Sequence, residues 1–488
     1  MSTDWDKCFH NPEDVSSKSI PNSSWPHVKF KAKWDAYVNK KEFTTLRSLR
    51  RLVVAHTMKS CRNLQYQLEG QVIRIGEEAD VIDQIARCRY YDYGDDYEMK
   101  LEPSEFTGVT EYDVVNQDCL YAAIHALKHR DMNPVVLNMA SAARAGGGYK
   151  AGSGAQEEEL FRRTNLFQVL ENHDGQYTKR HWTYPLPEFG GVYSPEAYLL
   201  RDGPDEGYRY MEEPCKLAFI SVAAYSRPGT EMNKKSKYLK LTSKFADKTM
   251  RKIRCMLTMA AENNHNALIL SAFGCGAYRN PPRHMAQLFR HVLLEPAFKN
   301  RFAYVCFAVI DDGNTKQEWN PEGNFLPFAE EFADLVIPKP DESVPIKFYR
   351  KGTDFGYFSN FSDHSVNLDG LVWPTSEHYY QAAKFPHSAK IQEDIRTAKG
   401  AHAAVKLGKT NGGMRKDWEQ VKDMVMEKVL YAKFSQHHDL TKLLLDTKNA
   451  MLIEHTDKDA YWGDGGNGGG KNRLGWLLMK TRHRLFLE

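Results

Sequence analysis

The stretch that decides the fold reads VVLNMASAARAGGGYKAGSGAQEEELFRRTNLF and runs from Val135 to Phe167. Its apolar start predicts a buried strand that ends at Asn138. A loop of small residues follows, and its glycines are Gly146, Gly147 and Gly148. An amphipathic helix is predicted next, and it opens with Gln156, Glu157 and Glu158. The order is therefore a strand, a glycine loop and an acidic helix start.

This order suits the binding and cleavage of a phosphate-bearing sugar. Glycines let the backbone approach a ligand closely and present bare N–H groups to phosphate. The N-terminus of a helix favours a pyrophosphate. A carboxyl group at the rim of such a site can donate a proton to a leaving oxygen. Taken alone, the same residues also fit an ordinary turn followed by an ordinary first helical turn, where Glu is common.

The spacing between GGG and QEE resembles the signature of the bacterial-type poly(ADP-ribose) glycohydrolases of the macrodomain superfamily. Ser271–Pro282 (SAFGCGAYRNPP) resembles the second phosphate loop of that family, and Val115–Ala123 (VNQDCLYAA) resembles its early ligand-facing segment. The resemblance extends roughly from Phe106 to Phe332. It implies a macrodomain-like mixed sheet between helices and an activity that cleaves ADP-ribose linkages.

The resemblance also implies roles for individual residues. Glu158 matches the catalytic glutamate, which would protonate the leaving ribose oxygen and then activate water. Glu157 matches the partner that holds the ribose hydroxyls. Glu159 extends the acidic run, and we expect it to be an exposed first-turn residue. The residues implied to contact ADP-ribose are Asn138, Gly146, Gly147, Gly148, Gln156, Phe273, Gly274, Gly276 and Tyr278.

The chain alternates predicted strands and helices between about Thr107 and Asp334, which indicates an α/β layered fold. The expected strands are Val135–Met139, Leu217–Ala223, Ala267–Ala272 and Ala303–Ile310. The expected helices are Thr44–Lys59, Val81–Tyr91, Cys119–His129, Glu158–Glu171, Lys244–Glu262 and Arg283–Leu293. We expect a helical N-terminal extension over residues 1–105, a macrodomain over 106–334, a proline-containing linker over 335–345 and a mainly helical α+β domain over 346–488.

A second candidate site lies in Trp373–Phe385, which reads WPTSEHYYQAAKF. Ser376 is a plausible N-cap for a helix. Glu377, Gln381 and Lys384 then fall at i, i+4 and i+7, which places them on one stripe. Arg415, Asp417 and Trp418 follow in RKDW, and a glycine loop runs through Trp462–Gly475 (WGDGGNGGGKNRLG). A solvated helix face and a flexible linker remain open as alternatives.

The glycine loop is not a nucleoside triphosphate site. It fits most of a Walker A pattern, but Asn472 stands where Ser or Thr would bind magnesium. The buried strand that precedes a Walker A loop is also missing from the sequence pattern. We therefore exclude a nucleoside triphosphatase.

The second site resembles the NADAR family, from FSNF at Phe358–Phe361 to the end of the sequence. That family cleaves N-glycosidic bonds of ribosyl groups on exocyclic amines, and some members resemble antitoxins that remove ADP-ribose from guanine in DNA. By this resemblance Glu377 would move the proton, and Lys384, if neutral, could attack the sugar carbon. Direct hydrolysis with Glu377 alone stays open. The residues implied to orient or contact the ligand are Asn360, Tyr380, Gln381, Arg415, Asp417, Trp418, Trp462, Asp464 and Asn472.

Composition bounds the possible partners. The formal net charge is +3, but residues 346–488 hold 22 Lys and Arg against 17 Asp and Glu, which permits contact with nucleic acid. The eight cysteines include no CxxC pair, which fits a reducing compartment, and we expect no cofactor and no metal. With no apolar leader and no long apolar run, we expect neither secretion nor a membrane partner, and an intracellular, cytoplasmic or nuclear location.

Three functions stay open. The first is a double ADP-ribosyl glycohydrolase, whose C-terminal domain acts on ADP-ribosylated guanine in nucleic acid and whose macrodomain acts on O-linked ADP-ribose on protein or poly(ADP-ribose). The second is an N-glycosidase of riboflavin biosynthesis intermediates with an ADP-ribose-binding macrodomain. The third is a binding module, against which Glu158 and Glu377 argue.

Overall fold

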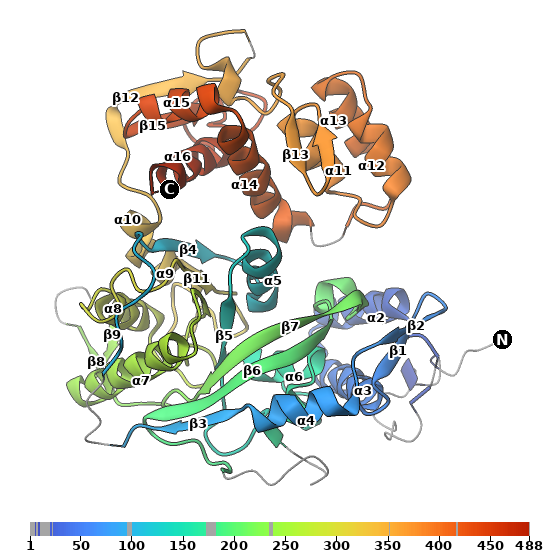
Figure 1. The fold of residues 1–488 in the computed structure, drawn as a ribbon, viewed down its shortest axis with the longest axis vertical. Helices are drawn as coiled ribbons and strands as arrows, with labels where there is room; N and C mark the ends of the chain where they lie inside the picture. Colours follow the sequence, from blue (N-terminus) through green and yellow to red (C-terminus); the bar gives the residue numbers. More distant parts are fainter. Residues whose placement is uncertain are drawn as a thin grey trace. The chain divides into compact units, whose positions relative to one another are not determined.

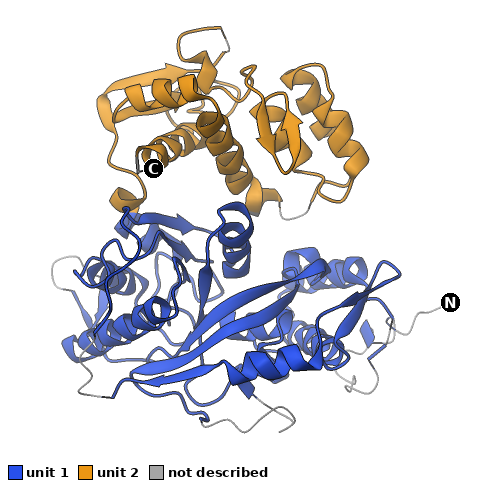
Figure 2. Ribbon diagram, viewed as in Figure 1, with its two compact units in different colours: residues 1–332 blue, residues 333–488 orange. Residues whose placement is uncertain are grey.

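A computed structural model describes residues 5, 8–9, 20–21, 23–94, 100–171, 182–233, 238–350, 352–415 and 418–487. The chain forms two compact units, Met1–Phe332 and Ala333–Glu488 (Figure 2). Within the described ranges, no helix combines the length and apolarity that a membrane span requires.

A seven-stranded sheet forms the centre of unit 1 (Figure 1). Its order is β3-β6-β7-β5-β10-β11-β4. The run from β7 to β4 is parallel, and β6 is antiparallel to both of its neighbours. The strands are β3 (Arg89–Asp92), β4 (Glu111–Val115), β5 (Pro134–Met139), β6 (Gly190–Arg201), β7 (Tyr210–Val222), β10 (Ala267–Leu270) and β11 (Tyr304–Ala308). The expected α/β mixed sheet is therefore confirmed.

Helices pack on this sheet, whose strands β10 and β11 are apolar along their whole length. All residues of β10 and β11 are buried, as expected for parallel strands covered on both faces. Helix α5 packs on β5, β10 and β11, whereas α7 packs on β6 and β7. The helices of this part are α5 (Cys119–His129), α6 (Gln156–Arg163), α7 (Ser243–Glu262), α8 (Pro282–Leu293) and α9 (Phe325–Glu331), with short turns at Tyr149–Ala151, Phe167–Glu171 and Pro204–Glu206 and a hairpin of β8 (Thr230–Met232) and β9 (Leu239–Leu241).

The N-terminal hundred residues belong to the same unit as the sheet. They contain α2 (His27–Lys40), α3 (Phe43–Arg62), α4 (Glu78–Ala86) and a hairpin of β1 (Gln65–Leu68) and β2 (Gln71–Arg74). The helix expected over Val81–Tyr91 in fact ends at Ala86, and the remaining residues form β3 of the central sheet. The sequence pattern set residues 1–105 apart as an extension, whereas the structure joins them to the α/β region through shared strands and a shared core.

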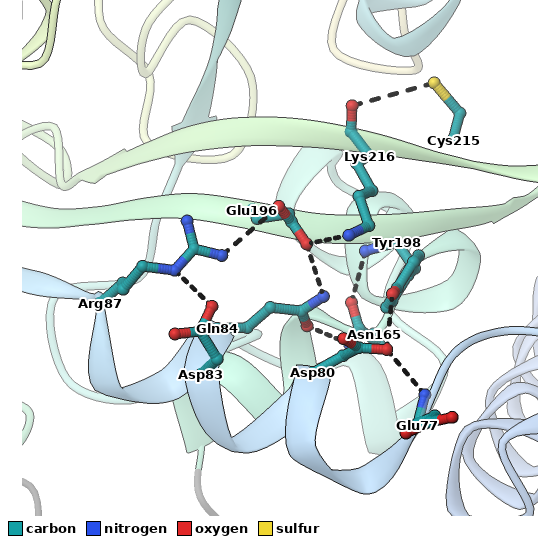
Figure 3. Close-up of polar contacts among 10 residues, drawn as sticks. All are labelled: Glu77, Asp80, Asp83, Gln84, Arg87, Asn165, Glu196, Tyr198, Cys215 and Lys216. Carbon is teal, nitrogen blue, oxygen red and sulfur yellow. Dashed lines mark hydrogen bonds and ion pairs between the residues drawn. The ribbon is translucent and has the colours of Figure 1, made fainter.

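Polar contacts join α4 to the sheet (Figure 3). Gln84 donates from Nε2 to Glu196 on β6 at 3.3 Å and accepts from Asn165 at 2.9 Å. Asn165 in turn accepts from the backbone N–H of Tyr198 at 2.7 Å. Because Gln84 and Asn165 are buried, these hydrogen bonds satisfy polar groups that would otherwise destabilise the fold.

Unit 2 is mainly helical around α14, which packs against α11, α15, α16 and β13. Its helices are α10 (Ala333–Val336), α11 (Ser376–Ala382), α12 (Ala389–Arg396), α13 (Ala401–Thr410), α14 (Trp418–Gln436), α15 (His438–Asp446) and α16 (Arg473–Leu487), with a turn at Gly356–Phe358. The strands pair as β12 (Asp341–Phe348) with β15 (Ala450–Glu454) and as β13 (Val366–Leu368) with β14 (Leu371–Trp373). Residues 341–345, expected to be linker, already belong to β12, where Pro345 lies at a break in register.

Candidate active sites

The two glutamates of unit 1 hold the glycine loop through its backbone. Glu157 accepts hydrogen bonds from the N–H groups of Ser141 at 2.8 Å and Gly146 at 2.9 Å. Glu158 accepts from Gly148 at 2.9 Å and from Ala155 at 3.0 Å, which also caps α6. The structure therefore brings the glycine loop and the acidic helix start into one site, as the sequence predicts.

Gly147 is required where the loop meets both carboxylates. Its φ is +50°, in the left-handed region that favours glycine. A Cβ at this position would lie 2.7 Å from an Oε atom of Glu158 and 3.1 Å from one of Glu157. Any side chain here would therefore push the loop away from the glutamates.

Burial changes the proton affinity of Glu157 and of the neighbouring Tyr278. Burial raises the pKa of Glu157 to about 8, although its two N–H donors favour the carboxylate. Tyr278 is half-buried, and burial raises the pKa of its phenol. The nearby charges of Glu157 and Glu158 raise this pKa further, and the hydroxyl forms a hydrogen bond with Ser141. Asn138 is fully buried and donates to Ser221 at 3.0 Å.

Two residues assigned to ADP-ribose contact have other surroundings. Gln156 uses both ends of its amide on β5, since it accepts from Met139 N–H at 2.9 Å and donates to the carbonyl of Leu137 at 2.6 Å. The side chain of Phe273 is fully buried and packs edge-on against Phe289. Gln156 therefore joins α6 to the end of the strand, and the ring of Phe273 belongs to the core.

The expectation for Glu159 is wrong. Its carboxylate pairs with Arg162 at 2.6 Å and accepts from the Tyr208 hydroxyl at 3.1 Å. Burial alone would raise the pKa of Glu159, but Arg162 and Arg163 outweigh it and lower the pKa. Arg162 is fully buried and needs a counter-charge, so Glu159 serves the fold.

Helix α3 contacts the glycine loop from the N-terminal part of the unit. Gly152, just after the triple glycine, passes so close that a Cβ would lie 2.2 Å from the carbonyl oxygen of Arg47. Thr57 donates to the carbonyl of Arg162 on α6 at 2.8 Å. No sequence pattern indicates this contact, because α3 lies about a hundred residues earlier in the chain.

In unit 2 the predicted stripe forms a chain of hydrogen bonds. Gln381 donates to Glu377 at 2.6 Å, and Lys384 donates to Gln381 at 2.7 Å. All three side chains are buried, so the solvated-face alternative does not describe this row. The N-cap of α11 is Thr375 and not Ser376, since the Thr375 hydroxyl accepts from the N–H of His378.

Burial acts in opposite directions on the two ends of this row. It raises the pKa of Glu377, against the influence of Gln381 and Lys384. It lowers the pKa of Lys384, whose ammonium lies 5.6 Å from the ring centre of Tyr380 and 5.5 Å from that of Trp418. A protonated carboxyl and a neutral amine are thus both more accessible than in water, which suits general acid catalysis and nucleophilic attack respectively.

Aromatic rings and one amide complete the surroundings of the row. Tyr380 packs edge-on against Trp418 at 4.9 Å and against Trp462 at 5.6 Å. The carbonyl of Asn360 accepts from the N–H of Glu377 at 3.2 Å, and its side chain donates to Met426. Its buried Oδ1 has no hydrogen-bond partner among the residues that the structure describes, so it is available to a ligand donor.

The remaining predicted residues contact the glycine loop, β15 and the end of α11. Asp464 accepts from the N–H groups of Thr456 and Gly466 and pairs with His455 at 2.7 Å, which fixes the glycine loop. Asn472 joins the same loop to β15, and the backbone of Arg415 donates to the carbonyl of Lys384 at 2.7 Å. Asp417 lies outside the described residues.

Sequence reasoning missed two acidic neighbours of Glu377. The charges of Asp459 and Glu377 act with burial to raise the pKa of Glu454 to about 8. Asp459 accepts from the N–H groups of Tyr461 and Trp462 at 2.8 Å, which positions the aromatic loop. Glu454 ends β15 and Asp459 lies in the segment after it. Both are far from α11 in the chain, so no spacing pattern could connect them.

Comparison with known proteins assigns unit 2. Residues 347–486 match the family model of the NADAR domain. The N-glycosidase YbiA of Shigella flexneri serotype 5b is 52% identical over 144 residues, which cover 29% of this chain and 89% of the relative. The chain belongs to the NADAR family. The chloroplastic riboflavin biosynthesis protein PYRR of Zea mays is 40% identical over 176 residues, which cover 33% of this chain and 28% of that protein.

The comparison also identifies unit 1 as resembling poly(ADP-ribose) glycohydrolase. Residues 54–202 match the family model of the microbial-type PARG catalytic domain. The crystal structure of poly(ADP-ribose) glycohydrolase from Thermomonospora curvata is 26% identical, with a TM-score of 0.45, and covers 58% of this chain and 99% of its own. This NADAR protein is thus a glycosyl hydrolase that also carries a poly(ADP-ribose) glycohydrolase-like domain.

Proposed function

We propose that unit 2 hydrolyses the N-glycosidic bond between ADP-ribose and guanine in nucleic acid, and that unit 1 hydrolyses O-linked ADP-ribose on protein or in poly(ADP-ribose). The buried row Glu377–Gln381–Lys384 carries the proposal for unit 2. The pairing with a poly(ADP-ribose) glycohydrolase-like domain supports ADP-ribose as the common ligand. None of the eight cysteines, all of which lie in the described residues, forms a disulfide, which supports a location in the cytosol or nucleus.

The row of unit 2 can cleave the bond in two ways. In direct hydrolysis water adds to the anomeric carbon, the carbon–nitrogen bond breaks, and Glu377 gives a proton to the leaving amine and takes one from water. In the covalent route the neutral amine of Lys384 attacks the anomeric carbon of the ring-opened sugar and displaces the guanine amine as a Schiff base forms. Water then hydrolyses the Schiff base and frees Lys384. In both routes the aromatic rings around Tyr380 exclude bulk water.

Unit 1 can cleave an O-glycosidic bond with its two carboxyl groups. Glu158 donates a proton to the leaving ribose oxygen, and its carboxylate then activates water. Glu157 holds the ribose hydroxyls, and the N–H groups of the glycine loop and of Gly274 and Gly276 bind the diphosphate. The close contact of Gly147 with both glutamates supports this assignment, because it fixes the loop and the acid in one geometry.

The names of two relatives favour a second candidate. YbiA is an N-glycosidase, and the maize relative acts in riboflavin biosynthesis. The same row could therefore cleave the N-glycosidic bond of a riboflavin biosynthesis intermediate, while unit 1 binds ADP-ribose.

The test uses a DNA oligonucleotide that carries ADP-ribose on guanine. The full chain is compared with its Glu158→Gln and Glu377→Gln variants, and released ADP-ribose is measured. Release that persists in Glu158→Gln and is lost in Glu377→Gln is the expected result. Release by Glu377→Gln at the wild-type rate would remove Glu377 from the mechanism.

Two further substrates decide between the candidates. Poly(ADP-ribose) cleavage should depend on Glu158 and not on Glu377. If no form releases ADP-ribose from the oligonucleotide but the wild type cleaves the riboflavin intermediate, the second candidate is correct for unit 2.

A further inference from the structure

A row of basic side chains lies along one side of α13. It consists of Lys399, just before the helix, and of His402, Lys406 and Lys409 within it. Their spacing of three, four and three residues places them on one face of a helix, and all four are exposed. We call these four residues the α13 row.

Helix α13 and the residues that flank it supply no acidic side chain to pair with the α13 row. Residues 395–416 contain no Asp and no Glu, although the whole chain has nearly equal numbers of basic and acidic residues, 66 and 63. Among the residues that the structure describes, the three lysines form no ion pair. Carboxylates three or four residues away on the helix would pair with such lysines. Without them, the row leaves a positive field on the surface.

The row leads to the candidate active site of unit 2. Helix α13 packs against α11 so closely at Gly408 that a Cβ there would lie 2.0 Å from Oε1 of Gln381. Lys409 is the next residue, and its charge is near enough to act on both Glu377 and Lys384. A polyanion that lies along the α13 row would therefore reach the row Glu377–Gln381–Lys384 at the end of α13 that carries Lys409.

An aromatic ring lies beside the row. Phe361, which follows Asn360, is partly exposed, and its ring centre is 4.9 Å from that of His402. Basic side chains with an interleaved aromatic ring are the arrangement by which proteins bind single-stranded nucleic acid, since the cations contact phosphates and the ring stacks on a base. An isolated pyrophosphate would use the cations but not the ring.

We propose that the α13 row, together with Phe361, binds the phosphodiester backbone and a flanking base of a nucleic acid strand whose modified guanine enters the site at Glu377. This inference rests on the proposed function of unit 2 and specifies its substrate as a polymer and not a free nucleotide. The footprint is about three phosphates, one for each lysine.

The test compares a polymer with a small substrate. The full-length triple variant Lys399→Gln, Lys406→Gln, Lys409→Gln is assayed on a single-stranded oligonucleotide with ADP-ribosylated guanine and on ADP-ribosylated guanosine. We expect kcat/KM for the oligonucleotide to fall about 10- to 100-fold at low salt and its salt dependence to flatten by about two to three in logarithmic slope. Cleavage of the nucleoside should change far less, because of the three lysines only Lys409 lies near enough to Glu377 and Lys384 to act on them by its charge.

A matched variant controls for charge alone. Lys347, Lys442 and Lys448 are also exposed, and they lie on β12, on α15 and just after α15, away from α13 in unit 2 (Figure 1). Their replacement by glutamine removes the same charge and should leave the cleavage of both substrates unaffected. Equal losses in the two triple variants would refute a specific surface. An equal loss on oligonucleotide and nucleoside in the α13 variant would show that the lysines act on ADP-ribose itself.

Binding separates this inference from the proposed reaction. An unmodified oligonucleotide labelled with a fluorophore should bind the wild type, and the α13 variant should bind it at least about tenfold more weakly by anisotropy. If the α13 variant binds the oligonucleotide more weakly but no substrate is cleaved, the α13 surface is supported as a binding site and the proposed reaction is refuted. If the α13 variant binds as the wild type does, the surface inference fails whatever the reaction.

Discussion

Replacing Gly408 with alanine should impair the row Glu377–Gln381–Lys384 of unit 2, although none of these three residues is replaced. In the interior of a helix this change normally stabilises by up to about 1 kcal/mol, because alanine has the higher helix propensity. Here the new Cβ would lie 2.0 Å from Oε1 and 2.9 Å from Cδ of Gln381. The Gln381 side chain must move, and it would then lose the hydrogen bonds that join it to Glu377 and Lys384.

The size of the effect follows from those two hydrogen bonds. Each buried partner left unsatisfied costs about 1–3 kcal/mol, so two cost about 2–6 kcal/mol. After the gain in helix propensity, we expect unit 2 to be destabilised by about 1–5 kcal/mol. We expect its kcat to fall about 10- to 100-fold, which corresponds to about 1.4–2.7 kcal/mol in the barrier.

The assay has an internal standard, because the same chain carries the Glu158 site. N-glycosidase activity is measured beside poly(ADP-ribose) cleavage, which should stay unchanged. A double-mutant cycle with Gln381→Ala then tests the route of the effect. If Gly408→Ala acts by displacing Gln381, it should have little further effect in the Gln381→Ala background. A Gly408→Ala protein that is more stable than the wild type and has wild-type kcat would refute the reasoning.

Four further predictions concern other contacts. Gly147→Ala should reduce poly(ADP-ribose) cleavage by at least about 100-fold, measured as ADP-ribose release, because its methyl group displaces the loop from Glu158; a silent change would mean that the loop is not part of the site. Lys433→Met should lower the free energy of unfolding of unit 2 by at least about 1–3 kcal/mol in a denaturant titration, which is the cost of one buried acceptor left unsatisfied. The buried Lys433 amine donates to the carbonyl of Ser359 and to two further acceptors in the loop of Asn360. The pKa of Glu157, raised to about 8 from 4.5, means that the folded unit keeps a proton that the unfolded chain releases. Its stabilising contribution is thus full below pH 4.5 and is lost as the pH rises through about 8, and thermal unfolding of Glu157→Gln should show a flatter pH dependence over that window. Chelators should leave both activities unchanged. A loss of activity that added magnesium restores would contradict the account of both sites.

The catalytic groups that sequence could predict are those held together by a single local segment. Glu157 and Glu158 come directly after the strand and glycine loop that they contact, and Glu377 and Lys384 share one helical stripe. Their mutual positions follow from secondary structure alone, with side chains recurring on a helix face at known intervals. Their roles in catalysis remain predictions.

The parts that sequence could not predict depend on packing between distant segments. Glu454 reaches the neighbourhood of Glu377 only because β15 pairs with β12 beside the glycine loop. The long strand β6 was missed because Gly190, Gly191 and Pro195 interrupt its pattern, and the structure accommodates the proline at a shift of register between Ser194 and Ala197. Thr375 rather than Ser376 caps α11 since either hydroxyl fits the pattern, and only the backbone geometry selects one.

The contact between α3 and the glycine loop changes where the catalytic part of unit 1 begins. A fragment that started at Phe106 would retain every residue of the glycine and glutamate signature. It would nevertheless expose Gly152 and α6 on the side that Arg47 and Thr57 cover in the full chain. Such a truncated protein would bear the motif without the support that fixes its shape. Substitutions in α3 would accordingly behave in a screen as active-site variants, although they lie outside the motif by which the enzyme is recognised.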